Sequence, residues 1–281
     1  MIVTRFAPSP NGPLHLGHAY AAIRAHDRAK EGGGRFLLRI EDIDGPRSRS
    51  DLHDEFRRDL EWLGLEWEEV PPQSQRVDAY SDTILQLLQQ GYLYPCTCTR
   101  SEIEKLEPRL GPQGAIYPGT CKGTKLRPDR KTALRLDVDK ALAAHPDLTW
   151  NDEIEGEHNV TLREIGDVVI ARKDLPASYH LAATVDDEAD GVTHVVRGAD
   201  LFMATHVHRM LQALLGLPVP IWHHHGLLFD ASGTKLAKRR GSPSLADRRN
   251  AGQDGTLLSE HLRLHRFPDD ITLADPTSEL S

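Results

Sequence analysis

The sequence predicts an α/β fold in which a parallel sheet is divided into two halves by an insertion. A strand, a loop, a helix and a second strand follow one another within the first 40 residues, which is the order of a βαβ unit with a right-handed crossover. Residues 91–175 have a different character and hold all three cysteines. From residue 192 a strand and a helix resume the α/β pattern.

The first βαβ unit is indicated by the turn residues between its elements. "MIVTRFAP" has short β character and stops at "PSPNGP", where three prolines and a glycine exclude regular structure. An alanine-rich helix is expected from His18 onward, ending at the glycines 32–34. "RFLLRI" at 35–40 is then expected to be a strand.

Two amphipathic helices are predicted to cover this sheet. Apolar residues recur at helical spacing in "RSDLHDEFRRDLEWLGL", residues 49–65. The same spacing recurs in "DAYSDTILQLLQQGYLYP", where the helix is expected to close at Gly91.

The rest of the chain divides by composition. We expect an α/β unit at 1–90 and 176–222, an insertion at 91–175, and a C-terminal region at 223–281. Within the insertion, alternating stretches such as "TALRLDV" predict antiparallel strands. In the second half, "VTHVV" predicts a strand ending at Arg197, and "MATHVHRMLQALLGL" predicts a helix. The last twenty residues are expected to be partly loose.

Composition favours a soluble, cytoplasmic protein. No run of apolar residues approaches the roughly 18–20 that a membrane span requires, and the N-terminus has neither a basic leader nor an apolar core. Three cysteines among 281 residues argue against a disulfide framework and leave the thiols available for metal. We therefore expect no membrane partner. We also expect a monomer, although no sequence feature determines the oligomeric state.

The charge distribution permits a nucleic-acid partner although the formal net charge is −8. Residues 51–70 carry a net charge of −6, whereas residues 231–250 carry +5. Screening limits surface charges to a reach of roughly 10 Å, so a polyanion can dock on the second face. The alternative is that the basic stretch is a solvated loop.

The stretch "HLGH" lies at the predicted strand-to-helix turn. Helix amide groups and the helix dipole favour phosphate there, and Gly17 lets a phosphate approach the backbone. His15 and His18 can donate hydrogen bonds to a phosphoryl group. Taken alone, the pair is more typical of packed core histidines than of a metal pair, because no supporting carboxylate is placed nearby.

A second candidate for phosphate chemistry is the loop "GTKLAKRRG" at 233–241. Lys235 and Lys238 can act as mobile point charges on a triphosphate and neutralise a departing pyrophosphate. A lysine-rich loop that is merely solvated gives the same pattern.

The cysteines are candidates for a structural metal. Cys96 and Cys98 form a C-x-C pair, and Cys121 follows in "YPGTC". A structural zinc takes four ligands, so three thiolates leave one position to be filled, and free buried cysteines remain the alternative. The histidines of "THVH" and "HHH" are interpreted as structural or nucleotide-adjacent. His206 and His208 are two apart on a predicted helix and face different sides, and the triplet follows a strand with no supporting carboxylate.

Taken together, "PSPNGPLHLGH" and "KLAKR" resemble the HIGH and KMSKS signatures of class I aminoacyl-tRNA synthetases. The stretches "RFAPSPNGPLHLGHAYAAI", "GGRFLLRIEDID", "YHLA", "THVVRGADL" and "GTKLAKR" occur in the order and form of the glutamyl-tRNA synthetases. The resemblance covers nearly all of residues 1–245. Leu16 and the pair at 236–237 depart from the commoner residues, but the histidines and lysines remain.

The chain stops where that family is expected to begin its anticodon-binding domain, and this shorter form resembles the glutamyl-Q tRNA(Asp) synthetase family. The resemblance implies tRNA-independent activation of L-glutamate with ATP. It also implies transfer of the glutamyl group to queuosine at the wobble position of tRNA(Asp), whose anticodon stem-loop is then the partner. Two alternatives stay open: a truncated glutamyl-tRNA synthetase that charges the 3′ end, and a non-catalytic zinc-containing module that binds RNA or protein.

The resemblance also implies a class I Rossmann-type sheet, split by a zinc-bearing, acceptor-like insertion and followed by a KMSKS loop and a helical, stem-contact-like region. His15, His18 and Lys238 are the implied catalytic residues. ATP, accompanied by Mg²⁺, is expected to contact His15, Gly17, His18, Lys235 and Lys238. One structural zinc is expected at Cys96, Cys98, Tyr117 and Cys121.

The glutamate pocket is expected at the ends of the two strands that flank the nucleotide crevice. Arg5 and Arg197 stand there and can bind the γ-carboxylate. The resemblance assigns the ammonium group to Glu41 with Ser9 and a neutral hydroxyl to Tyr179. The full expected set is Arg5, Phe6, Ala7, Pro8, Ser9, Glu41, Tyr179 and Arg197. For Arg5 and Glu41 alone, an ordinary surface ion pair is the alternative.

Overall fold

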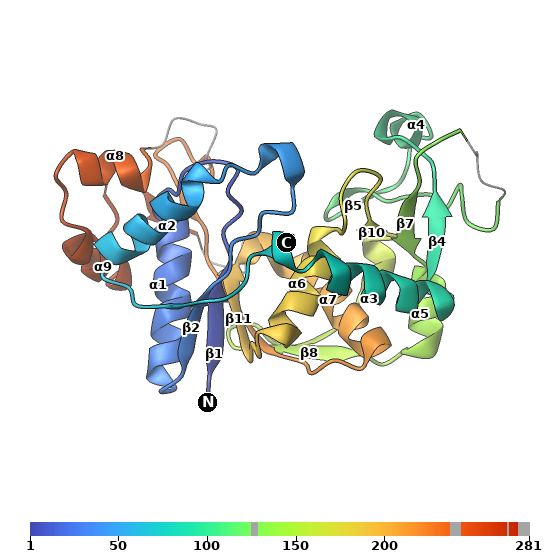
Figure 1. Ribbon diagram of the computed structural model, residues 1–281, viewed down its shortest axis with the longest axis horizontal. Helices are drawn as coiled ribbons and strands as arrows, with labels where there is room; N and C mark the ends of the chain where they lie inside the picture. Colours follow the sequence, from blue (N-terminus) through green and yellow to red (C-terminus); the bar gives the residue numbers. More distant parts are fainter. Residues whose placement is uncertain (125–128, 237–242, 269, 275–281) are drawn as a thin grey trace.

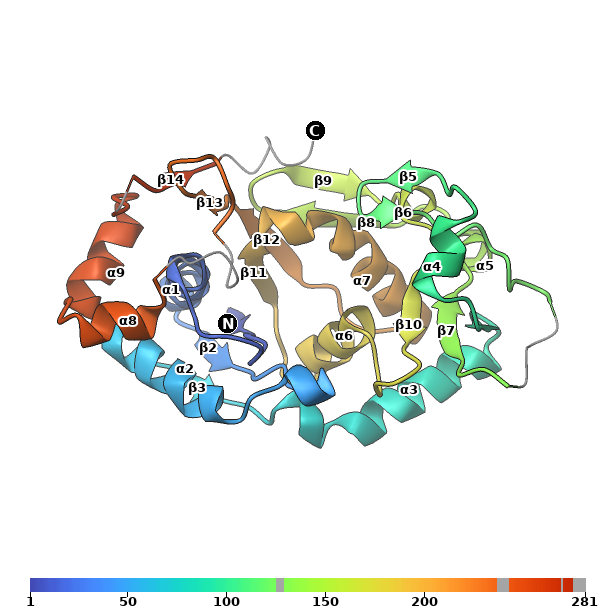
Figure 2. The same ribbon diagram turned by 90° about the horizontal axis from the view of Figure 1, so that it is seen from above.

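The computed structural model describes residues 1–124, 129–236, 243–268 and 270–274. The molecule is elongated, with α1, α2, α8 and α9 at one end and β4, β7, α4 and α5 at the other (Figure 1). The strands β11 and β12 lie between the two ends (Figure 2).

The predicted βαβ unit is present at the N-terminus. Strand β1 (Val3–Phe6) pairs in parallel with β2 (Arg35–Leu38), and α1 (Leu16–Glu31) connects them. The short β3 (Glu68–Glu69) extends this sheet in parallel. Gly34 is required where the chain passes Ile2, because a Cβ there would lie 1.7 Å from the Ile2 carbonyl oxygen.

A second sheet continues the first. It has the order β11 (His194–Gly198), β12 (Ile221–His225), β8 (Thr149–Asp152) and β9 (Gly156–Asn159). Strands β11, β12 and β8 are parallel, and β9 is antiparallel to β8. The Thr193 N–H donates to the Val3 carbonyl at 3.0 Å, which ties β11 to β1. The sheet edge that carries Arg197 therefore lies beside the edge that carries Arg5.

The expected insertion contains a separate antiparallel sheet, which confirms the prediction from "TALRLDV". Its order is β10 (Val169–Ala171), β7 (Ala133–Leu136) and β4 (Leu93–Cys96). Strand β8 also falls within the expected range 91–175, but it shares its sheet with β12. The other elements of this range are α4 (Arg100–Glu104), β5 (Leu110–Gly111), β6 (Gly114–Ala115), α5 (Val138–Ala144) and the 3₁₀ turn η3 (Leu162–Glu164).

The predicted helices are also present, as α2 (Asp51–Trp62), α3 (Val77–Gln89) and α7 (Phe202–Leu215). Helix α2 packs on the first sheet as predicted, but α3 packs against α6 and β4 instead. Helix α6 (Tyr179–Ala189) was not predicted. Its buried face is not recognisable from the sequence, because that face carries two charged residues, Asp186 and Asp187, which are 0% and 6% exposed. Further 3₁₀ turns are η1 (Gly45–Arg47), η2 (Gln73–Gln75) and η4 (Ala199–Leu201).

The C-terminal region returns to the N-terminal half. Helix α9 (Gly255–Arg263) lies beside α1, α8 (Leu245–Asn250) lies beside α2, and β14 (Thr272–Leu273) pairs with β13 (Leu228–Phe229) (Figure 2). Part of the +5 charge is neutralised here, because Arg249 pairs with the buried Asp59. Residues 237–242 of the basic stretch lie outside the described residues.

Within the described residues, no helix has the length and apolar character that a membrane crossing requires.

A buried charge network fixes the sheet against α6. Arg39, directly after β2, is 0% exposed and lies 2.8 Å from Asp187, 2.9 Å from Asp190 and 3.4 Å from Glu41. Burial alone would lower the pKa of Arg39, but these carboxylates raise it well above its ordinary value. The guanidinium is therefore the charge that makes burial of the surrounding acids tolerable.

Replacing Arg39 by methionine should leave buried carboxylates without their counter-charge. We expect Arg39→Met to lower the free energy of unfolding by about 3–5 kcal/mol. Urea unfolding followed by circular dichroism measures the change. Arg35→Met is the matched control: Arg35 is four residues earlier and pairs with the exposed Glu68, so little change is expected. Equal losses in both variants would contradict the account.

Candidate active site

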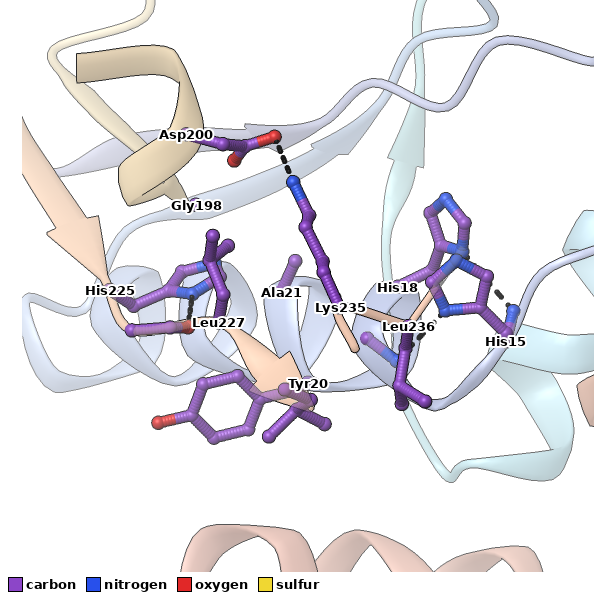
Figure 3. A pocket seen from close by; sticks show the side chains of 13 residues that line it. His15, His18, Tyr20, Ala21, Gly198, Asp200, His225, Leu227, Lys235 and Leu236 are labelled. Atoms are coloured by element: carbon purple, nitrogen blue, oxygen red, sulfur yellow. Dashed lines mark hydrogen bonds and ion pairs between the residues drawn. The ribbon is translucent and has the colours of Figure 1, made fainter. Parts of the chain in front are cut away.

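The predicted phosphate-binding residues line one cavity of about 320 Å³ (Figure 3). It lies where α1 begins, beside the end of β12 and the segment that carries Lys235. Of the residues expected to contact ATP, His15, Gly17, His18 and Lys235 line it, and Lys238 lies outside the described residues.

His15 and His18 cap the start of α1. The Nδ1 atom of His15 accepts from the Gly17 N–H at 3.1 Å, and Nδ1 of His18 accepts from the His15 N–H at 3.1 Å. An accepting Nδ1 places the hydrogen of a neutral imidazole on Nε2. Each ring therefore presents an Nε2–H donor, and the two ring centres lie 3.9 Å apart. Helix α1 begins two residues before the predicted start because these side chains form its cap.

Gly17 is required by this cap. A Cβ at this position would lie 3.0 Å from Cε1 and 3.2 Å from Nδ1 of His15. Its N–H is already bonded to His15, so the small residue makes room for an imidazole as well as for a ligand.

Lys235 lines the same cavity and is paired with Asp200. Its ammonium lies 2.6 Å from a carboxylate oxygen of Asp200, and Figure 3 shows the extended side chain pointing from the cavity wall toward that residue. Both groups are partly exposed, so the pair can open without a large desolvation change.

A second cavity of about 450 Å³ adjoins the first, and both are lined by His18, Ala21, Gly198 and Asp200. It lies at the ends of β1 and β11. All the residues that were expected to contact glutamate line it: Arg5, Phe6, Ala7, Pro8, Ser9, Glu41, Tyr179 and Arg197.

Arg5 and Glu41 are buried, so the alternative of a surface ion pair is wrong. Arg5 is 5% exposed and makes a two-point contact with Asp187, at 2.9 and 3.3 Å. Glu41 is 8% exposed, and burial raises its pKa to about 7, although Arg39 and Arg5 oppose this rise. The cavity is thus lined by the guanidinium of Arg5, part of which is bonded to Asp187, and by the carboxyl group of Glu41, whose pKa is about 7.

Arg197 reaches the same cavity from β11. Its guanidinium donates to Nε2 of His224, to the Tyr179 hydroxyl, to Nδ1 of His208, to the Leu201 carbonyl and to the Thr205 hydroxyl. These acceptors are neutral. Burial lowers the pKa of Arg197, and no carboxylate among the described residues forms an ion pair with it.

The interpretation of the other histidines needs one correction. We expected no carboxylate beside "HHH", but Asp152 bonds His224 at 2.7 Å and Glu153 bonds His223 at 3.0 Å. Asp152 is the last residue of β8 and Glu153 follows it, and the sequence did not place this strand next to β12. His206 and His208 face different neighbours, as predicted: His206 accepts from the Thr161 N–H, and His208 contacts Arg197.

The three cysteines come together at the far end of the molecule. Their sulfurs lie within 4.8 Å of one another, and Sγ of Cys98 and Cys121 are 3.5 Å apart. Tetrahedral zinc with bonds of about 2.3 Å to sulfur holds its sulfur ligands about 3.8 Å apart, which is close to this separation. The Tyr117 hydroxyl lies 3.4 Å from Cys96 Sγ and 3.5 Å from Cys98 Sγ. The donor set therefore fits a zinc ion.

Asp200 and His225 line the first cavity but were not named as site residues from the sequence, although the "HHH" triplet was interpreted as structural or nucleotide-adjacent. Asp200 belongs to the recognised stretch "THVVRGADL", but only the structure shows its contact with Lys235. His225 also lines the cavity, and its Nδ1 bonds the Gly226 carbonyl. It stood in the "HHH" triplet, which offers no signal that separates its three members.

Comparison with known proteins agrees with this arrangement. Residues 1–266 match the family model described as tRNA synthetases class I (E and Q), catalytic domain. A glutamyl-Q tRNA(Asp) synthetase of Rhodobacter capsulatus is 47% identical over 89% of this chain and 96% of that protein. Proteins of the same name from Symbiobacterium thermophilum and Deinococcus radiodurans are 40% and 43% identical, over 93% and 92% of this chain and 85% and 88% of those proteins.

Solved structures share the fold. A glutamate–tRNA synthetase from Elizabethkingia anophelis aligns with a TM-score of 0.78 at 24% identity, over 99% of this chain and 65% of that one. Methionyl-tRNA synthetase from Mycobacterium tuberculosis aligns with a TM-score of 0.60 at 15% identity, over 96% and 65% of the two chains. With its own motifs on two adjoining cavities and relatives that match along nearly their full length, the chain belongs to the class I glutamyl/glutaminyl tRNA synthetases and is a ligase of the glutamyl-Q tRNA(Asp) synthetase family.

Proposed function

We propose that this chain activates L-glutamate with ATP in the absence of tRNA and transfers the glutamyl group to queuosine at the wobble position of tRNA(Asp). The observation that carries the proposal is the wall shared by the two cavities, which brings a carboxylate-binding pocket next to a phosphate-binding helix start. The names and identities of the relatives favour the queuosine acceptor.

In this proposal the glutamate cavity orients the amino acid. Arg5, Tyr179 and Arg197 recognise the γ-carboxylate, and ionised Glu41 with Ser9 holds the ammonium group. The segment Phe6–Pro8 forms the floor. The α-carboxylate is left facing His18, at the boundary with the nucleotide cavity.

The proposed chemistry is an in-line attack of the α-carboxylate on the α-phosphorus of ATP, with pyrophosphate as the leaving group. His15 and His18 donate their Nε2–H to phosphate oxygens, while Lys235 and Lys238 neutralise the departing pyrophosphate. Class I synthetases use Mg²⁺ with ATP, and the ion neutralises phosphate charge. Positioning and electrostatics suffice, so no covalent enzyme nucleophile is required.

The domain division remains part of the proposal. Residues 1–90 and 176–222 form the catalytic unit, 91–175 the acceptor-like insertion, and 223–281 the KMSKS-loop and stem-contact-like region. We further propose a cytoplasmic monomer that takes the anticodon stem-loop of tRNA(Asp) to the active site.

Two other functions make different predictions. A truncated glutamyl-tRNA synthetase shares the fold, but it charges the 3′ end. A non-catalytic zinc-containing module that binds RNA or protein has no use for a buried carboxyl group and a buried cation in one cavity.

Glutamate-dependent exchange of pyrophosphate into ATP should proceed with no tRNA present. His18→Ala should reduce kcat by about 100-fold or more, because a donor to the developing phosphoryl charge is lost. His26→Ala, on the same helix but outside both cavities, should retain activity. Exchange that appears only when tRNA(Glu) is added would favour the truncated synthetase.

The glutamate affinity should depend on the ionisation of Glu41. Only the carboxylate binds an ammonium group, and burial raises the pKa of Glu41 from 4.5 to about 7. We therefore expect kcat/KM for glutamate to be full above pH 7 and to fall about tenfold per unit of pH below it. Exchange assays between pH 5.5 and 8.5 measure this.

Glu41→Gln should give a low rate without that inflection. The KM for ATP should change little, both in this variant and in the wild type across the pH range. An inflection near 4.5 would contradict the assignment of Glu41.

We propose one structural zinc held by Cys96, Cys98, Tyr117 and Cys121. The purified protein should contain about one zinc per chain by elemental analysis, and Cys98→Ser should lose most of it. Removal should unfold the antiparallel sheet of β4, β7 and β10 before the α/β unit. Ser101→Ala, in the neighbouring α4, is the control. Equal metal contents in Cys98→Ser and the control would exclude the site.

A further inference from the structure

Arg197 is a buried cation that neutral groups hold in place. Its side chain is 5% exposed, and the ion pairs among the described residues do not include it. A guanidinium has five N–H donors, and the five acceptors around Arg197 use all of them. The orientation of the guanidinium is therefore determined by four side chains and one backbone carbonyl, none of which carries a charge.

One of these side chains, His224, is itself fixed from the opposite side. The Nε–H of Arg197 donates to Nε2 of His224 at 3.1 Å, so this nitrogen is an acceptor. The ring hydrogen must then be on Nδ1, which lies 2.7 Å from Oδ2 of Asp152. Both side chains are 0% exposed. Asp152 thus selects the one neutral tautomer of His224 that can accept from Arg197.

The pair has no freedom to reorient. Oδ1 of Asp152 accepts from the N–H groups of Ile154 and Glu155 at 2.9 and 3.1 Å. The ring of His224 packs against Phe202 and Trp150, with ring centres 5.1 and 5.9 Å away. The turn after β8 therefore fixes a carboxylate, which fixes an imidazole, which fixes the guanidinium.

The Nη1 atom makes the weakest contacts of the Arg197 guanidinium, and one of them is to Tyr179, which lines the glutamate cavity. Nη2 bonds the Thr205 hydroxyl at 2.6 Å and the Leu201 carbonyl at 3.1 Å. Nη1 has the two longest contacts, 3.2 Å to the hydroxyl of Tyr179 and 3.3 Å to His208. A carboxylate entering beside Tyr179 meets Nη1 and the tyrosine hydroxyl first.

We infer that Asp152 and His224 are positioning residues that hold the Arg197 guanidinium toward the glutamate cavity and thereby set the preference for a side-chain carboxylate over an amide. This inference rests on the proposed function. A carboxylate gains a charge-assisted hydrogen bond from a correctly oriented guanidinium, whereas the amide of glutamine gains only a neutral one. Disorienting Arg197 therefore costs glutamate more than glutamine.

His224→Phe tests the inference, because it keeps the ring volume and removes the hydrogen bonds of the ring with Arg197, Asp152 and Thr205. Pyrophosphate exchange is measured with glutamate and with glutamine. We expect the KM for glutamate to rise about tenfold or more, with kcat and the KM for ATP changing far less. The ratio of kcat/KM for glutamate to that for glutamine should fall about tenfold.

His206→Phe is the matched control. His206 is buried against the same Trp150 ring, and its Nδ1 accepts from the Thr161 N–H, but it does not contact Arg197. Its substitution should leave the glutamate-to-glutamine ratio unchanged. If His224→Phe lowers both substrates' kcat/KM equally, His224 has only a structural role and the inference is wrong.

Asp152→Asn tests the same link if His224→Phe does not fold. An amide that satisfies Ile154 and Glu155 turns its NH₂ toward His224, which favours the tautomer that cannot accept from Arg197. The ratio should fall in the same direction, and an unchanged ratio in a folded variant overturns the inference. Absence of glutamate-dependent exchange in the wild type is a separate outcome, because it contradicts the proposed function itself.

Discussion

The active cavity depends on how the protein neutralises buried charge. Arg39 sits among Glu41, Asp187 and Asp190, and Asp187 in turn holds Arg5. Removing any one of these groups leaves another in a low-dielectric interior without its partner, which costs more than the pair contributes. The strand ends and α6 are therefore fixed to each other by a charge network that includes Arg5 and Glu41, two residues that line the second cavity.

This constraint explains the different environments of the two pocket arginines. The charge of Arg5 is neutralised by Asp187, which accepts from its Nε and Nη2 atoms, so its burial does not depend on a substrate. Arg197 is held by neutral acceptors, and its field is not cancelled locally. In the proposed function, the side-chain carboxylate of glutamate supplies a negative charge to Arg197. Beside them, Glu41 has a pKa near neutrality because burial opposes its ionisation more strongly than the arginines favour it.

Short-range pattern predicted much of the fold, because β1, α1 and β2 followed from turn residues and spacing. The cap that His15 and His18 form was not predicted, and α1 therefore begins two residues earlier than expected. Helix α6 escaped prediction because its buried face carries Asp186 and Asp187, which read as surface residues. The link from Asp152 to His224 spans 72 residues and exists only because β8 pairs with β12. Such contacts depend on sheet order, and local periodicity does not encode sheet order.

The most direct test of the account is transfer of labelled glutamate to tRNA. With ATP present, the protein should label tRNA(Asp) that contains queuosine, and the label should be lost when the anticodon stem-loop is removed. Queuosine-free tRNA(Asp) and tRNA(Glu) should remain unlabelled. Labelling of the 3′ end of tRNA(Glu), or equal labelling of tRNA(Asp) with and without queuosine, would contradict it.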